Sequence, residues 1–149
     1  MRTIKFRGIW FEDGSWVYGN YVRKNQHIRS CIDGHVTHVV NYDYIVNQDE
    51  IDNLKYHQVH PDTVCKFTGF TDKNGKEIYE GDVIHIGPDY CVVIWVEDLG
   101  GFYLKADHAK LPCDSPLGAM LHRYDFNVIG NIYEQKWTMR VKVSQRKEG

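Results

Sequence analysis

Apolar and polar positions alternate in short runs over the first forty residues. Residues 4–11 and 16–22 are rich in aromatic and β-branched side chains, and an Asp-Gly pair lies between them. Asp-Gly flanked by such runs indicates a β-hairpin, because these residues tolerate the positive φ that tight turns require. The sequence therefore predicts a hairpin here and a second one around Asp33-Gly34, which joins residues 28–32 to 35–40.

The pattern changes in the middle of the chain. Between residues 47 and 57 the apolar residues become sparse, which predicts a loop or one to two helical turns. From Val59 onward, short apolar runs return and are separated by turn signals such as Asn74-Gly75 and Gly100-Gly101. No helical pattern of about 10–15 residues separates successive runs, so the spacing favours an all-β barrel or sandwich over β-α-β units.

The expected fold is mainly β, with an N-terminal β-hairpin unit packed on a small C-terminal barrel. The predicted parts are an N-terminal β unit of residues 1–58, a barrel of residues 59–134 and a tail of residues 135–149. A single integrated domain is the alternative. At most a short helix is expected, near Leu117–Leu121, because Pro112 and Pro116 prevent a longer one.

Composition narrows the class of protein. The chain has 149 residues, 42% hydrophobic and 13% aromatic, which excludes a disordered or fibrous protein. A net charge of -2 gives no overall attraction to nucleic acid or to an anionic membrane. No apolar run approaches the ~20 residues that span a bilayer, and no signal peptide is recognisable, so we expect a cytoplasmic protein without a membrane partner. The four cysteines lack a Cys-x-x-Cys pair and are expected to be reduced thiols.

Candidate catalytic groups have simpler structural interpretations. Glu77, Glu80 and Asp82 are close in sequence, but Gly81 between the last two predicts a turn rather than an acid/base pair. His35 and His38 are spaced three residues apart, which on a strand places the rings on opposite faces. His57 and His60 flank an expected loop, where the rings can converge, but no Cys or carboxylate at a familiar zinc spacing supports a metal site there. No nucleotide-binding or nucleophile motif is present. We therefore expect no enzyme activity, no metal and no cofactor, with a small metal-dependent hydrolase built on His57 and His60 as a remote alternative.

The C-terminal segment differs from the rest in charge. Residues 134–149 hold five basic and two acidic residues, hence a net charge of +3, which leaves -5 for residues 1–133. Trp137, Met139, Val141 and Val143 alternate with Lys136, Thr138, Arg140 and Lys142. This period of two predicts an extended strand with one apolar and one basic face, which would pair with its own body, with a second copy or with another partner.

Aromatic residues of the first hairpin are candidate contacts as well. Trp10 and Trp16 lie close in sequence to Arg7, and both hairpin faces carry apolar groups. Exposed aromatics serve either as an interface for a protein or as a platform on which bases stack. The candidate contact residues are Arg7, Trp16, Trp137 and Arg140.

Several motifs resemble the YopX family of phage and prophage proteins. They are Ile-Lys-Phe-Arg-Gly at 4–8, Trp-Val-Tyr-Gly at 16–19, Pro-Asp-Thr-Val at 61–64, Thr-Gly-Phe-Thr-Asp-Lys-Asn-Gly-Lys-Glu-Ile-Tyr-Glu-Gly-Asp at 68–82 and Val-Ile-Gly-Asn-Ile-Tyr-Glu at 128–134. The resemblance implies a mostly β chain whose C-terminal half is an SH3-like barrel, encoded in a phage or prophage and located in the bacterial host cell. It implies no reaction.

The function that we expect is that of a non-enzymatic binding module. Its partner is expected to be a protein, with a homo-oligomer favoured. The first alternative is a single-stranded nucleic-acid binder that uses the aromatic residues of the first hairpin, Arg7 and the basic tail.

Overall fold

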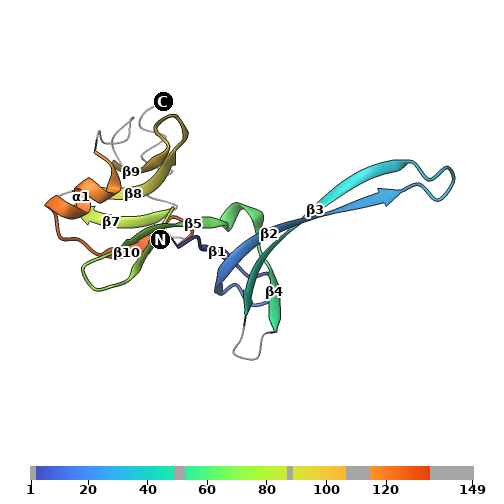
Figure 1. Ribbon diagram of the computed structural model, residues 1–149, viewed down its shortest axis with the longest axis horizontal. Helices are drawn as coiled ribbons and strands as arrows, with labels where there is room; N and C mark the ends of the chain where they lie inside the picture. Colours follow the sequence, from blue (N-terminus) through green and yellow to red (C-terminus); the bar gives the residue numbers. More distant parts are fainter. Residues whose placement is uncertain (1–2, 49–52, 87–88, 107–114, 135–149) are drawn as a thin grey trace. The chain divides into compact units, whose positions relative to one another are not determined.

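The computed structural model describes residues 3–48, 53–86, 89–106 and 115–134. The mainly β class is confirmed: the described residues form antiparallel strands, two short 3-10 turns and a short α-helix, α1 (Leu117–Arg123) (Figure 1). Backbone contacts divide the chain into two compact units, residues 4–66 and residues 67 onward together with residues 1–3. The domain boundary predicted between residues 58 and 59 stays a prediction.

The N-terminal unit is an antiparallel meander. Its strand order is β4-β3-β2-β1, and the first residues of β5 pair with β1 on the far side. The elements are β1 (Phe6–Ile9), β2 (Trp16–Arg29), β3 (Val36–Gln48), β4 (Leu54–Gln58), the 3-10 turn η1 (Pro61–Thr63) and β5 (Cys65–Thr71).

Both predicted hairpins are confirmed, and they share β2. In the second, the Ser30 N–H donates to the His35 carbonyl at 2.8 Å, and Gly34 takes a φ of +73° that favours glycine. The strands are longer than the apolar pattern indicates, since β2 continues to Arg29. Cross-strand backbone pairing extends them beyond the apolar residues, because ladder hydrogen bonds form whatever the side chain.

The prediction for residues 47–57 is wrong where the structure describes them. Residues 54–58 form the strand β4, which pairs with β3 from Tyr44↔Gln58 to Gln48↔Leu54. Leu54 and Tyr56 are exposed, so this strand buries little apolar surface and leaves a weak hydrophobic pattern. Backbone pairing to β3 fixes the conformation here, a tertiary effect that local sequence does not encode.

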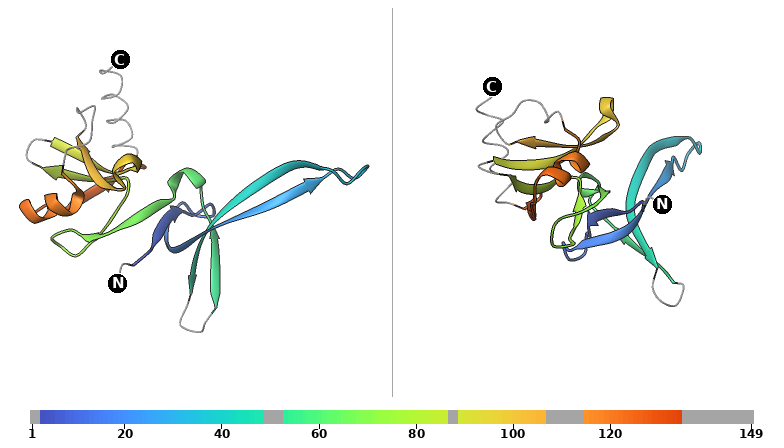
Figure 2. Two further views of the ribbon diagram at one scale, coloured as in Figure 1. Left: turned by 45° about the horizontal axis from the view of Figure 1, so that its top comes forward. Right: turned by 60° about the vertical axis from the view of Figure 1, so that its left-hand side comes forward.

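Part of the N-terminal unit is a two-stranded arm. On β2, only residues 16–19 pair with β1. On β3, only residues 44–48 pair with β4. Among the described residues, the strand register pairs residues 23–29 and 36–43 only with each other, and we call this hairpin, with its turn, the arm (Figures 1 and 2). Side chains of residues 23–29 are all exposed.

Asp43 lies at the root of the arm and is buried. Its Oδ1 accepts hydrogen bonds from the Tyr21 hydroxyl and from Arg23 Nε, the latter at 2.9 Å. Burial alone would raise the pKa of Asp43, but the two donors outweigh it and hold the pKa below its ordinary value. The ionised carboxylate of Asp43 on β3 is thus hydrogen-bonded to the side chains of Tyr21 and Arg23 on β2.

The C-terminal unit consists of a four-stranded antiparallel sheet, a short strand pair and α1. The sheet order is β10-β7-β8-β9, while the end of β5 pairs with β6. The elements are β6 (Glu77–Tyr79), β7 (Asp82–Ile86), β8 (Asp89–Val96), the 3-10 turn η2 (Glu97–Leu99), β9 (Gly101–Ala106) and β10 (Val128–Asn131).

Its core matches the apolar runs of the sequence. Except for β6, where the sequence predicts a turn, the strands lie where those runs predict them, and the short helix is confirmed near residue 117. The most buried core side chains come from β6, β7, β8, β9, α1 and Phe126: Ile78, Ile84, Cys91, Val93, Phe102, Leu104, Leu117 and Phe126. The closed, SH3-like barrel stays a prediction.

Asp72 connects segments that are far apart in the chain. Its Oδ1 accepts the backbone N–H groups of Asn74 and Lys76, both at 2.9 Å, and its Oδ2 accepts that of Val128 at 3.0 Å. Burial raises the pKa of Asp72, but the three N–H donors outweigh burial and keep the pKa below its ordinary value. The turn between β5 and β6 is thereby attached to the start of β10.

We expect Asp72→Ala to lower the free energy of unfolding by about 3 kcal/mol, because three backbone N–H groups lose a buried, charged acceptor. Urea unfolding followed by circular dichroism measures the change. Asp98→Ala is the matched control, since Asp98 is exposed, and it should change stability by less than about 0.5 kcal/mol. An equal effect of the two substitutions would contradict the role of Asp72.

The pKa values of Asp43 and Asp72 also predict how stability depends on pH. Both lie below the ordinary value of 3.8, so their stabilisation is complete above the unfolded-state pKa and disappears as the pH falls through the folded-state pKa. The free energy of unfolding should be level above about pH 5 and should decline below pH 4. In Asp72→Asn the decline between pH 5 and pH 3 should be shallower.

Candidate functional site

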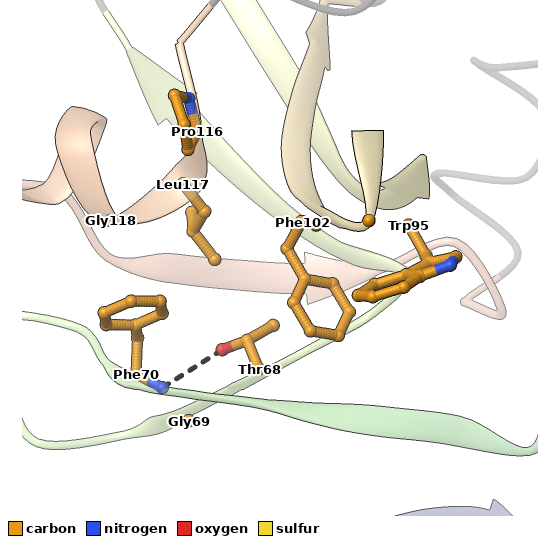
Figure 3. A pocket seen from close by; sticks show the side chains of 10 residues that line it. Thr68, Gly69, Phe70, Trp95, Phe102, Pro116, Leu117 and Gly118 are labelled. Atoms are coloured by element: carbon orange, nitrogen blue, oxygen red, sulfur yellow. Dashed lines mark hydrogen bonds between the residues drawn. The ribbon is translucent and has the colours of Figure 1, made fainter. Parts of the chain in front are cut away.

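The C-terminal unit carries an open groove with aromatic walls. Its volume is about 510 Å³, within the range of about 300–1,000 Å³ that ligand pockets have. Three segments line it, one from β5, one around the η2 turn and one at the start of α1: Thr68, Gly69, Phe70, Trp95, Gly100, Gly101, Phe102, Pro116, Leu117 and Gly118. Figure 3 shows Phe70, Leu117 and Phe102 facing a common space, with Trp95 beside Phe102.

Strand register positions the two rings on one side of the groove. Trp95 on β8 and Phe102 on β9 are directly opposite each other, and their rings meet edge to face with centroids 5.0 Å apart. The Trp95 indole N–H donates to Glu97 Oε2 at 2.6 Å. Because the turn brings Glu97 back toward the indole, one carboxylate holds the Trp95 ring in place beside the groove.

The opposite wall depends on a close approach between β5 and α1. A Cβ added to Gly118 would lie 2.9 Å from Cζ of Phe70, so glycine allows the Phe70 ring to pack against the start of the helix. The backbone N–H of Phe70 donates to the Thr68 hydroxyl at 3.2 Å, and that hydroxyl donates to the Ile78 carbonyl at 2.7 Å (Figure 3). Phe70 is 41% exposed, although its ring packs against the start of α1 and its backbone is hydrogen-bonded to Thr68.

Acidic groups dominate the charge of this unit. Glu97 and Asp98 are exposed on the η2 turn next to Trp95. The described residues from 67 to 134 include four Lys or Arg and nine Asp or Glu, hence a net charge of -5. An apolar groove beside two carboxylates favours a ligand that combines apolar and cationic groups.

Two predicted contact residues lie together in the N-terminal unit. Arg7 is 4% exposed, and its guanidinium carbon lies 4.4 Å from the centroid of the Trp16 ring. Trp16 is half-buried and opposite Ile9. This geometry makes Arg7 a support for Trp16, whereas Trp16 retains some exposed ring surface. Contacts of either residue with a partner stay predictions, and Trp137 and Arg140 lie outside the described residues.

The carboxylates of the central motif form a turn, as expected. Asp82 is 1% exposed and its Oδ2 accepts the backbone N–H of Tyr79 at 2.8 Å. The Tyr79 hydroxyl donates to Glu77 Oε2 at 2.8 Å, and Gly81 between Glu80 and Asp82 has a φ of +85°. These side chains stabilise the chain reversal between β6 and β7.

The histidine pairs do not converge. His57 meets the edge of Trp10 with centroids 4.8 Å apart, while His60 lies 3.8 Å from Phe11. His35 and His38 are exposed on the arm. Within the described ranges, no three His, Cys, Asp or Glu side chains come together in a way that would hold a metal ion. The positions of His57 and His60 against two different aromatic rings therefore give no support to the hydrolase alternative.

Cys31 is an exposed free thiol in the turn of the arm, and Cys65 and Cys91 are buried. Across the described residues, no helix is long and apolar enough to cross a bilayer.

Sequence reasoning missed the groove. Its walls come from segments up to fifty residues apart, and only β pairing and the position of α1 bring Phe70, Phe102 and Leu117 together. Trp95 and Phe102 are each the second residue outside the turn of residues 97–100, and residues that flank a hairpin turn at equal distances face each other. The sequence signal Gly100-Gly101 locates this turn only approximately, because Gly101 already belongs to β9.

The arrangement defines a two-unit, mainly β protein whose described surface offers an arm and a groove. Its sequence matches the family described as YopX protein over residues 5–137, and the chain belongs to this family. A comparison with curated proteins gave no match. A similar solved structure is the crystal structure of protein EF1440 from Enterococcus faecalis, with 18% identity and a TM-score of 0.47, covering 93% of this chain and 99% of that chain.

We expect Arg7→Ala to lower the free energy of unfolding by about 2 kcal/mol, because the buried side chain packs under the Trp16 ring. Urea unfolding gives the magnitude. Lys5→Ala is the control, since the Lys5 ammonium lies 5.9 Å from the Tyr18 ring in a less buried position, and its effect should stay within about 0.5 kcal/mol. Unchanged stability of Arg7→Ala would contradict the role of Arg7 as a support for Trp16.

Proposed function

We propose that this YopX protein is a non-enzymatic binding module that acts through its arm, in a phage or prophage setting within the cytoplasm of the bacterial host. The single observation that carries the proposal is the arm itself: the strand register pairs residues 23–29 and 36–43 only with each other among the described residues, and all their side chains except Val40, Tyr42 and Asp43 are exposed. A two-stranded ribbon is at best marginally stable alone in water, and unpaired strand edges favour association.

Apolar side chains near the end of the arm support a protein as the partner. Ile28 is 44% exposed, Val36 42%, Val39 52% and Ile32, in the turn, 93%. Ile28 is opposite His38 and Val39 is opposite His27, so each face of the arm offers an exposed aliphatic group to a partner. A second copy of this chain is the partner that we favour, because an arm with two open edges can pair with its own equivalent in a symmetric dimer.

The cations of the arm argue against nucleic acid. Arg23 is bound to Asp43, the Lys24 ammonium lies 4.3 Å from the Tyr56 ring centroid, and Arg29 Nη1 donates to the Gly34 carbonyl at 3.1 Å. Phosphate binding depends on cations that can neutralise backbone charges. Each arm cation already has an intramolecular partner, so a protein interface is the better supported proposal.

We expect the double substitution Ile28→Thr and Val39→Thr to weaken self-association by about 10- to 100-fold. Threonine keeps the β-branched shape that strands favour, while removal of two apolar contacts costs about 1.4–2.8 kcal/mol of binding free energy. Light scattering after size-exclusion chromatography over a concentration series measures the dissociation constant. A reductant is required because Cys31 is exposed.

Ile129→Thr provides the matched control, because Ile129 is 43% exposed on β10 and lies outside the arm. It should leave association unchanged. A monomer at every concentration would exclude a second copy as the partner. Salt-sensitive binding of mixed oligonucleotides by the same protein would favour the nucleic-acid alternative instead.

A further inference from the structure

The aromatic groove in the C-terminal unit suggests a second binding event, separate from the arm. We propose that the groove binds residues 136–143 of its own chain. These residues lie outside the described part of the structure, and the proposal rests on their sequence, on the groove and on the place where the described chain ends.

The chemistry of the segment complements that of the groove. Residues 136–143 read Lys-Trp-Thr-Met-Arg-Val-Lys-Val and carry three positive charges without an acidic residue. In an extended conformation, Trp137 and Met139 share a face with two valines, and the cations share the other. The apolar face matches a groove lined by Phe70, Phe102 and Leu117, and the cations match the exposed carboxylates beside it.

The end of the described chain lies within reach of the groove. The Ile132 N–H donates to the Gly81 carbonyl at 2.9 Å, and the Gly81 N–H donates to the Val93 carbonyl at 2.8 Å. Val93 is two residues before Trp95 on β8. Each of these two hydrogen bonds joins backbones about 5 Å apart, and two strand residues add about 7 Å. The distance from Ile132 to Trp95 is therefore at most about 17 Å.

Residues 131–134 form a turn, in which the Glu134 N–H donates to the Asn131 carbonyl at 3.1 Å. The nine residues from Glu134 to Val143 can extend over about 30 Å, so part of the segment reaches the groove.

Charge distribution within the chain favours this occupant over an unrelated peptide. The described part of the C-terminal unit has a net charge of -5, and the segment that follows it is basic. A tethered segment also has a high effective concentration, about millimolar for a short flexible connection, so even weak apolar contacts suffice for occupancy.

Photo-crosslinking in the full-length protein tests the proposal directly. We would place benzoylphenylalanine at position 137, irradiate, and identify the cross-linked peptides by mass spectrometry. The expected products contain Phe70 or the stretch from Pro116 to Gly118. The same residue at position 145, outside the alternating segment, is the control and should give at least threefold less of these products.

Mixing ¹⁴N- and ¹⁵N-labelled copies shows whether the cross-link forms within one chain. Products of a single isotope composition support the proposal. Mixed products would overturn it in favour of exchange between copies, and products that contain only arm residues, or none at all, would overturn it outright.

Two substitutions examine the groove and the charge separately. Gly118→Ala should reduce the cross-link yield at least threefold, because the added Cβ displaces the Phe70 ring; Ala119→Ser on the same helix should not. Arg140→Glu should reduce the yield about threefold or more at low salt, and Arg146→Glu, outside residues 136–143, should leave it unchanged. Equal effects of the members of either pair would contradict the proposal. None of these outcomes bears on the arm, whose association is measured independently.

Discussion

The N-terminal unit depends on a buried carboxylate at the base of the arm, which determines which side chains of the arm are left for contacts with a partner. Asp43 accepts hydrogen bonds from Tyr21 and Arg23, and its backbone carbonyl accepts the Val59 N–H at 2.9 Å. An ion removed from water is tolerated only when such partners replace its hydration. Because the same residue connects β2, β3 and the segment after β4, the arm starts from a fixed base and its outer side chains are left for contacts.

The C-terminal unit solves a comparable problem with Asp72. Three backbone N–H groups converge on one carboxylate and attach a turn to a strand more than fifty residues later. Beside these internal polar contacts, two apolar features are open to contacts on the described surface: the exposed aliphatic residues of the arm and the aromatic groove.

The sequence predicts the fold well where local signals are strong. Asp33-Gly34 and Gly100-Gly101 mark turns through the φ angles that glycine permits, and the apolar run of β8 marks a core strand. It predicts poorly where tertiary pairing decides: β4 buries almost nothing apolar, yet its backbone ladder with β3 makes it a strand. Of the candidate site, the pairing of Arg7 with Trp16 was accessible from the hairpin register, whereas the groove depends on contacts between distant segments.

Open strand edges allow association with a partner, but they can also cause aggregation, because further strands can add to them without limit and form fibrils. The aliphatic residues of the arm do not form long runs: Ile28 is followed by Arg29, and Val39 and Val40 are enclosed by His38 and Asn41. Charged and polar neighbours of this kind act as gatekeepers against aggregation. The arm therefore combines apolar groups that can bind a partner with polar groups that keep it soluble. The protein should become more prone to form amyloid when these polar neighbours are replaced by apolar residues.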